Sequence, residues 1–181
     1  MATWGSRGLR GSTLEDLVNL SIEQYRKTGL GLVQKIPTPI KPLEIDKNTR
    51  HITLAYFDQK STVDYIGVVQ GIPVCFDAKE CMSDSFPVAN IHEHQMNFMT
   101  DFEKQDGIAF ILLYMEHRDE LYYIPFRDVF SFWKRARSGG RKSFTYDEID
   151  RDYRIIPKKG LPVPFLEALK KDLDFRQADT E

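Results

Sequence analysis

Two β-rich runs separated by Gln70-Gly71 constrain the fold of this chain most strongly. The first run covers residues 61–69 and the second covers residues 72–79. β-branched and aromatic residues on both sides of a glycine-containing break are typical of an antiparallel hairpin. A two-residue loop and a symmetric four-residue loop give the same register. In that register Asp64 lies opposite Asp77.

The predicted register also places Thr62 opposite Lys79, and alternation along the strands puts all four side chains on one face. Like charges opposed on a sheet repel, by about 3 kcal/mol at roughly 5 Å and an effective dielectric near 20. A divalent cation would remove this repulsion, because oxygen ligands suit Mg²⁺ or Mn²⁺. Lys79 would then stabilise charge on a phosphate. The pattern indicates a metal-dependent nuclease; a solvated hairpin face is the alternative interpretation.

Length and composition set broader bounds. The chain has 181 residues, which predicts one domain, and a net charge of −2, so any nucleic-acid surface must be local. Its two cysteines, Cys75 and Cys81, and the lack of an apolar leader favour a reducing cytoplasm. No run reaches transmembrane length, so we expect no membrane partner.

The ends of the chain are predicted from capping signals and composition. Residues 1–11 are expected to be a flexible segment, residues 12–174 a single nuclease domain, and residues 175–181 a frayed tail. Ser12–Glu15 matches a capping box for a helix that ends at Gly29. Glu15 is therefore either a cap partner or an acid that reaches the metal site from this helix.

A proline-flanked ribbon is predicted at about residues 39–57. Leu43–Ile45 and Ile52–Phe57 bracket a polar turn, and prolines before them exclude an ordinary helix or central strand. The pair is either a projecting stalk or an edge hairpin. Its cations are Lys41, Lys47 and Arg50.

Five further helices and strands are predicted after the hairpin. Residues 81–88 are expected to form a loop, and Asn90 to cap a helix that runs to about Gln105. Gln95 on this helix is either a polar site residue or a plain helix former. The remaining predicted elements are a buried strand at Ile108–Met115, a return strand at Leu121–Pro125, a helix at Asp128–Arg137 and a terminal helix at Leu161–Leu173.

Residues 134–142 carry five positive charges in nine positions and no acid. Arginine and lysine around the flexible Gly139-Gly140 suit phosphate contacts. The candidates for these contacts are Arg135, Arg137, Arg141 and Lys142. A solvated helix end, where cations complement the helix dipole, is the alternative.

Taken together, these landmarks resemble the RecU family of bacterial Holliday junction resolvases. The matching pieces run in family order from residue 10 to about residue 165, and His-Glu-His-Gln after an acid-Ala-Lys strand is the most specific of them. The pieces are Lys35–Ile40, Ala55–Phe57, Ser61–Val68, Phe76–Glu80, Phe86–Pro87, His92–Gln95, Gln105–Gly107 and Gly140–Ser143.

The resemblance implies an α/β, restriction-endonuclease-like core, with a mixed β-sheet flanked by helices and a protruding two-stranded stalk, working as a homodimer. It implies a metal site at Thr62, Asp64, Asp77 and Gln95, with Lys79 as transition-state stabiliser and the stalk in the junction centre. The family usually has Glu at the position of Asp77, and often a longer basic N-terminal tail.

The predicted function is a Mg²⁺-dependent endonuclease, with Mn²⁺ as a substitute, that cuts four-way DNA junctions in homologous recombination and repair. The expected catalytic residues are Asp64, Asp77, Lys79 and Glu15. The expected location is the cytoplasm, in association with the nucleoid. The expected partners are branched DNA, a second copy of the chain and recombination proteins. A duplex-cutting endonuclease and a non-catalytic junction-binding modulator are the alternatives.

Overall fold

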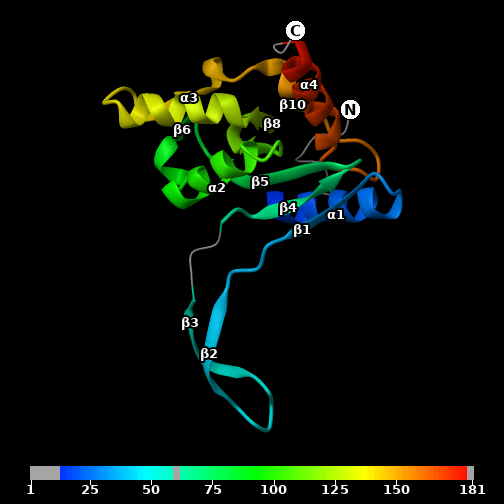
Figure 1. Cartoon of the computed structure of the whole chain (residues 1–181), viewed down its shortest axis with the longest axis vertical. Helices are drawn as coiled ribbons and strands as arrows, with labels where there is room; N and C mark the ends of the chain where they lie inside the picture. The colour runs from blue at the N-terminus through cyan, green and yellow to red at the C-terminus, as the bar shows by residue number, and fades with distance from the viewer. Residues whose placement is uncertain (1–12, 59–61, 179–181) are drawn as a thin grey trace.

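A six-stranded sheet forms the centre of the computed structural model, which describes residues 13–58 and 62–178. The predicted flexible segment 1–11 lies outside the described residues. The strand order is β1-β4-β5-β7-β8-β10 (Figure 1). Only β5 and β7 are parallel, so the sheet is mixed. Its strands are β1 (Gly31–Lys35), β4 (Tyr65–Val69), β5 (Ile72–Cys81), β7 (Ile108–Met115), β8 (Glu120–Pro125) and β10 (Arg154–Ile155).

Helices cover both faces of this sheet (Figure 1). One buried cluster joins the sheet to α1 (Leu14–Lys27) and α4 (Phe165–Ala178). The other joins it to α2 (Glu93–Glu103) and α3 (Phe126–Arg137). The α/β class, with a mixed sheet between helices, is therefore as predicted. Within the described part of the chain, no helix has both the length and the apolar character needed to cross a bilayer.

The β4–β5 hairpin has the predicted register, with Tyr65 opposite Phe76 and Val69 opposite Ile72. Its two-residue turn needs positive φ at both central positions, and Gln70 and Gly71 have φ values of 49° and 85°. This backbone matches the right-handed twist of the flanking strands, and so the turn fixes the register.

A row of aromatic rings crosses the sheet on the α1/α4 face. Tyr65 stacks on Phe76 at 4.7 Å between ring centroids, Phe76 on Phe110 at 4.6 Å, and Phe110 on Tyr123 at 4.3 Å. These four residues lie on neighbouring strands, β4, β5, β7 and β8. Such cross-strand pairs stabilise a sheet and hold its register. The row therefore anchors the start of the hairpin, where the acidic residues lie.

The segment between β5 and α2 differs from the predicted loop at 81–88. β5 extends to Cys81, and β6 (Ser85–Pro87) pairs with β9 (Ser143–Thr145). A 3-10 turn, η1 (Val88–Asn90), follows. Asn90 does not cap the next helix: α2 begins at Glu93 and ends at Glu103, before the predicted end. Three further 3-10 turns are η2 (Glu116–Arg118), η3 (Tyr146–Glu148) and η4 (Arg151–Tyr153).

The first helix begins one residue later than its predicted capping box. The N-cap is Thr13, whose side chain accepts from the amide of Asp16, and Asp16 in turn accepts from the amide of Thr13. Glu15 therefore has no capping role. The carboxylate of Glu80 also accepts from the amide of Leu14 at 2.6 Å, which joins the end of β5 to the start of α1.

The C-terminal helix starts and ends later than predicted. α4 begins at Phe165 because Pro162 and Pro164 exclude the preceding residues from a helix. It continues to Ala178, into the tail that the sequence predicts to be frayed. Arg176 is fixed there by two hydrogen bonds, at 2.6 and 2.8 Å, to the carboxylate of Glu103 at the end of α2.

A two-stranded ribbon projects from the core as a stalk (Figure 1). It consists of β2 (Ile40–Ile45) and β3 (Ile52–Phe57), which pair with each other in a sheet of their own. The pairing contains irregularities at residues 42–45. The alternative of an edge hairpin on the main sheet is therefore wrong, and the predicted stalk is correct.

Candidate active site

Two aspartates meet at the open end of the hairpin, and the carboxylate of each accepts a hydrogen bond from a backbone amide across the hairpin. The amide of Asp64 donates to Oδ1 of Asp77 at 2.8 Å, and the amide of Ala78 donates to Oδ2 of Asp64 at 3.1 Å. Asp64 directly precedes β4, and Asp77 lies in the middle of β5. The hairpin therefore brings together the two carboxylates that the sequence places opposite each other.

Asp77 is fully buried, with an exposed fraction of 0%. Its Oδ2 atom accepts no hydrogen bond from the residues that the structure describes. Lys79 Nζ lies 3.5 Å from this oxygen, which is an ion-pair distance rather than a hydrogen bond. Burial raises the pKa of Asp77 from 3.8 to about 6; Lys79 opposes this shift and the charge of Asp64 adds to it. One oxygen of a buried, acidic group is thus left without a donor.

The face that carries Asp77 is covered rather than solvated. Alternation along β5 turns Val74 and Phe76 toward α1 and α4, and turns Cys75 and Asp77 toward the opposite face. Cys75 belongs to the cluster that α2 and α3 close. The alternative of a solvated hairpin face therefore does not hold for Asp77. Burial makes an unpaired charge costly, and this cost is what a cation would relieve.

Thr62 and Gln95 differ in solvent exposure. Thr62 is exposed on the segment that leads into β4. Gln95 is buried, with an exposed fraction of 6%, on the helix that covers the Asp77 face. Its Oε1 atom accepts from the amide of His92 at 2.9 Å. An amide oxygen has a second lone pair, so this bond leaves Gln95 one further acceptor position.

Glu15 lies near the same end of the hairpin but is engaged elsewhere. Its carboxylate forms an ion pair with Lys35 at the end of β1, and both side chains are 43% exposed. Its backbone oxygen accepts from the hydroxyl of Tyr65 at 3.4 Å. The catalytic role of Glu15 stays a prediction, and it requires the ion pair with Lys35 to open.

The oxygen atoms around Asp77 fit a hard divalent cation. Among the described residues, no three His, Cys, Asp or Glu side chains are grouped closely enough to hold a metal. Asp64 and Asp77 would therefore need neutral oxygen ligands, such as the Thr62 hydroxyl and the Gln95 amide. Mg²⁺ usually binds through one or two carboxylates, with waters and substrate phosphates completing its shell. The unpaired, buried Oδ2 of Asp77 is the observation that favours such a ligand.

Comparison with known proteins places this chain in a family. The sequence model of the family described as Recombination protein U (RecU) matches residues 9–171. The chain belongs to the RecU family. A Holliday junction resolvase RecU from Listeria welshimeri is 40% identical over 169 residues, covering 91% of this chain and 84% of the relative. One from Levilactobacillus brevis is 41% identical over 167 residues, covering 90% and 83%.

One solved structure that resembles the chain is the Holliday junction resolvase Hjc of Archaeoglobus fulgidus. The TM-score is 0.41 at 6% sequence identity, and the match covers 72% of this chain and 89% of that protein. This likeness is too low to support conclusions about the chain. The structure itself shows the mixed sheet between helices, and the restriction-endonuclease-like core that the resemblance implied stays a prediction.

The raised pKa of Asp77 predicts a pH dependence of stability in the metal-free protein. Asp77 binds its proton more tightly when folded, so its contribution is fully present below about pH 4 and is lost as the pH rises through about 6. The loss amounts to at most about 3 kcal/mol in the free energy of unfolding. Asp77→Asn should remove this dependence. Urea unfolding of both proteins across this pH range measures it, and parallel profiles would contradict it.

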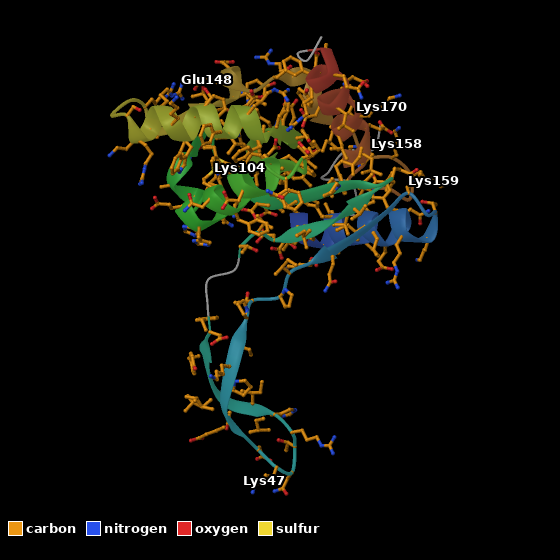
Figure 2. All side chains as sticks on the ribbon, viewed as in Figure 1. Lys47, Lys104, Glu148, Lys158, Lys159 and Lys170 are labelled. Atoms are coloured by element: carbon orange, nitrogen blue, oxygen red, sulfur yellow. The ribbon has the colours of Figure 1, made fainter. Side chains whose placement is uncertain are left out.

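The basic run at residues 134–142 acquires acidic partners when the chain folds. Arg135 and Arg141 both pair with the carboxylate of Glu148 in η3, which lies beside α3 (Figure 2). Arg137 pairs with Glu93 at the start of α2, at 2.8 Å. Sequence reasoning missed Glu148 as a partner. The run has no acid within its own sequence, but folding brings acidic side chains of η3 and α2 to three of its arginines.

Arg135 should matter more for stability than for DNA affinity. Its guanidinium also donates to the backbone oxygen of Ser143 at 2.9 Å. Arg135→Ala should lower the free energy of unfolding by about 1–3 kcal/mol, since it leaves charged and polar partners unpaired. Lys142→Ala, at an exposed site, should change it by less than about 0.5 kcal/mol. Urea unfolding separates the two; equal effects would show that Arg135 is a surface cation.

The stalk carries three cations, two acids and much exposed apolar surface. Lys41, Lys47 and Arg50 are accompanied by acidic neighbours, and Lys47 lies at the far end (Figure 2). Asp46 holds the turn by accepting from the amides of Asn48 and Thr49, and these bonds lower its pKa. Seven large apolar side chains are more than two-fifths exposed: Ile40, Leu43, Ile45, Ile52, Leu54, Tyr56 and Phe57. Exposed apolar surface on this scale marks an interaction site.

Proposed function

We propose that this chain is a Holliday junction resolvase, a metal-dependent endonuclease that cuts four-way DNA junctions in homologous recombination and repair. The observation that carries the proposal is the buried Asp77 carboxylate beside Asp64, with one oxygen left without a donor. The RecU relatives bear the name Holliday junction resolvase. Mg²⁺ is the proposed cofactor, and Mn²⁺ should substitute because these oxygen ligands suit both ions.

Asp64, Asp77, Thr62 and Gln95 are the residues that would hold the metal. When bound, such an ion supplies an activated water and neutralises charge on the phosphate. The hairpin holds the two carboxylates in position through their backbone hydrogen bonds, so little rearrangement is needed. Lys79, one strand step from Asp77 and only 18% exposed, would donate to the phosphate oxygens as negative charge develops.

A homodimer would account for the cutting of two strands. A closed two-fold dimer presents two equivalent sites, related in the same way as two strands of like polarity in a junction. The stalk, which projects from the core, would occupy the open centre between the arms. Lys41, Lys47 and Arg50 would there contact phosphates, while the apolar side chains of the ribbon would contact bases or the second stalk.

Lys79→Ala should lower the cleavage rate by roughly 10²–10³-fold, the usual loss for one donor to a developing oxyanion. Single-turnover cleavage of a bound junction measures the rate without product release. Lys159→Ala, at an exposed turn residue distant from the hairpin's open end, serves as the matched control. A change of less than about threefold would assign Lys79 a purely structural role.

A junction labelled in turn on each of its four strands tests the proposed function. A resolvase in Mg²⁺ should place symmetric nicks in two strands of like polarity and release nicked duplexes. Equal cutting of a linear duplex of the same sequence would favour the duplex-cutting alternative. Tight binding without nicks, in Mg²⁺ and in Mn²⁺, would favour the non-catalytic alternative.

A further inference from the structure

A cavity of about 550 Å³ opens between the start of α2 and the second half of α3. Its volume lies within the range of roughly 300–1,000 Å³ that is common for small-molecule sites. The proposed reaction does not use it. The lining residues are Val88, Ala89, Ile91, His92, Glu93, Trp133, Ala136, Arg137 and Lys142.

One wall of the cavity is aromatic and its rim is basic. Trp133 is half-buried in α3, and the guanidinium of Arg137 lies 5.0 Å from the centre of its ring. Lys142 is exposed and also lines the cavity, and none of the ion pairs among the described residues includes it. Two cations against the single carboxylate of Glu93 leave the rim net positive. An apolar, aromatic wall below a cationic rim matches a nucleobase joined to a phosphate.

The ion pair that crosses the cavity can be exchanged for a phosphate. Arg137 and Glu93 are each 59% exposed at their side chains, and exposed pairs of this kind are weak. A phosphodiester offers the same guanidinium a charge-assisted, bidentate partner. Movement of Arg137 from Glu93 to a phosphate would also uncover the indole of Trp133.

The cavity lies next to the candidate metal site. His92 lines it and also donates its amide to Gln95, which is buried on the helix that covers the Asp77 face. His92 and Gln95 are separated by one helical turn or less, which is roughly 5 Å along the axis. A DNA strand whose cut phosphate lay beside Gln95 would bring a neighbouring nucleotide to the cavity that His92 lines.

We propose that this cavity receives one unstacked nucleotide of the DNA strand, adjacent to the phosphodiester that is cut. The base stacks on Trp133, and its phosphate is bound by Arg137 and Lys142. Extruding a base is least costly where its stacking is already interrupted, as at a branch point. The inference rests on the proposed function, because it takes the strand at the metal site to be junction DNA.

Photo-crosslinking tests the contact directly. The full-length Asp77→Asn variant is used, because it should bind junctions without cutting them. It is mixed with junctions that carry 5-iododeoxyuridine at a single position near the cut, and each complex is irradiated. One position next to the cut should crosslink, and mass spectrometry should map the adduct to Trp133. Adducts only at other residues, or at no position near the cut, would overturn the proposal.

Binding by single variants provides an independent test. Trp133→Ala should weaken junction binding by about 5- to 100-fold, as for loss of a base–aromatic stack, and Trp133→Phe should restore most of it. Lys142→Ala should weaken binding and reduce the log–log salt slope by about 0.9. Lys170→Ala, on α4 (Figure 2), is the matched control and should change neither. If Lys142→Ala behaves like Lys170→Ala, the phosphate contact is absent.

The two proposals fail in different ways. A parent protein that neither binds nor cuts four-way junctions overturns the proposed function, and the nucleotide site falls with it. A parent that cuts junctions normally, while Trp133→Ala and Lys142→Ala leave binding and cutting unchanged, overturns only the nucleotide site. Because Lys142 is exposed, its variant tests the proposal even where Trp133→Ala does not fold.

Discussion

Asp77→Asn is expected to abolish junction cleavage while leaving junction affinity within about threefold. An asparagine oxygen can still accept from the amide of Asp64, so the end of the hairpin should keep its conformation. The neutral amide lacks the second carboxylate oxygen, whose burial without a donor marks the metal position. Loss of that charge weakens the binding of a hard cation and so removes activation of the water. Gel-shift titrations and single-turnover cleavage measure the two quantities separately.

Asp172 provides a matched control for this experiment. It is also a fully buried aspartate, but its oxygens are occupied by Arg127, Arg176 and the hydroxyl of Tyr123. Asp172→Asn should therefore lower stability, by about 3–5 kcal/mol if the buried pair is broken, while the folded fraction still cuts. Normal cutting by Asp77→Asn at saturating Mg²⁺ would show that the metal site lies elsewhere.

Replacing Ile40–Phe57 by a short Gly/Ser linker should remove the preference for junctions over duplex DNA and most junction cleavage. No residue of this range belongs to either buried cluster, so the core should fold without it. Shortening a loop costs little chain entropy of its own. The ribbon is the projecting part of the described chain, and an open centre is what distinguishes a four-way junction from duplex DNA. Calorimetric titration with Mn²⁺ should show metal binding as in the parent.

A second variant separates charge from apolar surface in the stalk. With Lys41, Lys47 and Arg50 all changed to Ala, the ribbon keeps its exposed apolar side chains and loses its cations. If phosphate contacts dominate, this variant should lose junction preference nearly as fully as the deletion. A shortened protein that folds, binds Mn²⁺ and still selects junctions as well as the parent would show that the ribbon has no role in recognition.

Local signals were sufficient to predict the hairpin, the stalk and the buried strand. Gln70-Gly71 fits the tight turn of the hairpin, and that turn sets the register that brings Asp64 beside Asp77. Ile108–Met115 has the predicted bounds because a continuous apolar run can only be buried on both faces. Pro37 and Pro39 lie between β1 and β2 and separate the ribbon from the main sheet.

Contacts between distant parts of the chain could not be predicted in this way. Glu148 neutralises Arg135 and Arg141 only because η3 folds back against α3. Likewise, Asp77 is buried because α2 covers the face of the sheet that carries it. The alternation of side chains along a strand shows which residues share a face, but it does not show whether a helix covers that face. The sequence predicted which side chains meet in the hairpin, but not their burial or the charges that face them.

An anomalous-scattering map from crystals of the whole chain grown with Mn²⁺ would test the candidate metal centre most directly. The account predicts a peak within about 2.0–2.6 Å of Oδ2 of Asp77 and of the Asp64 carboxylate, the distances of hard-cation ligands. The same map from Asp77→Asn crystals should lose that peak. A Mn²⁺ peak away from both carboxylates, with none between them, would contradict the assignment of this hairpin as the metal centre.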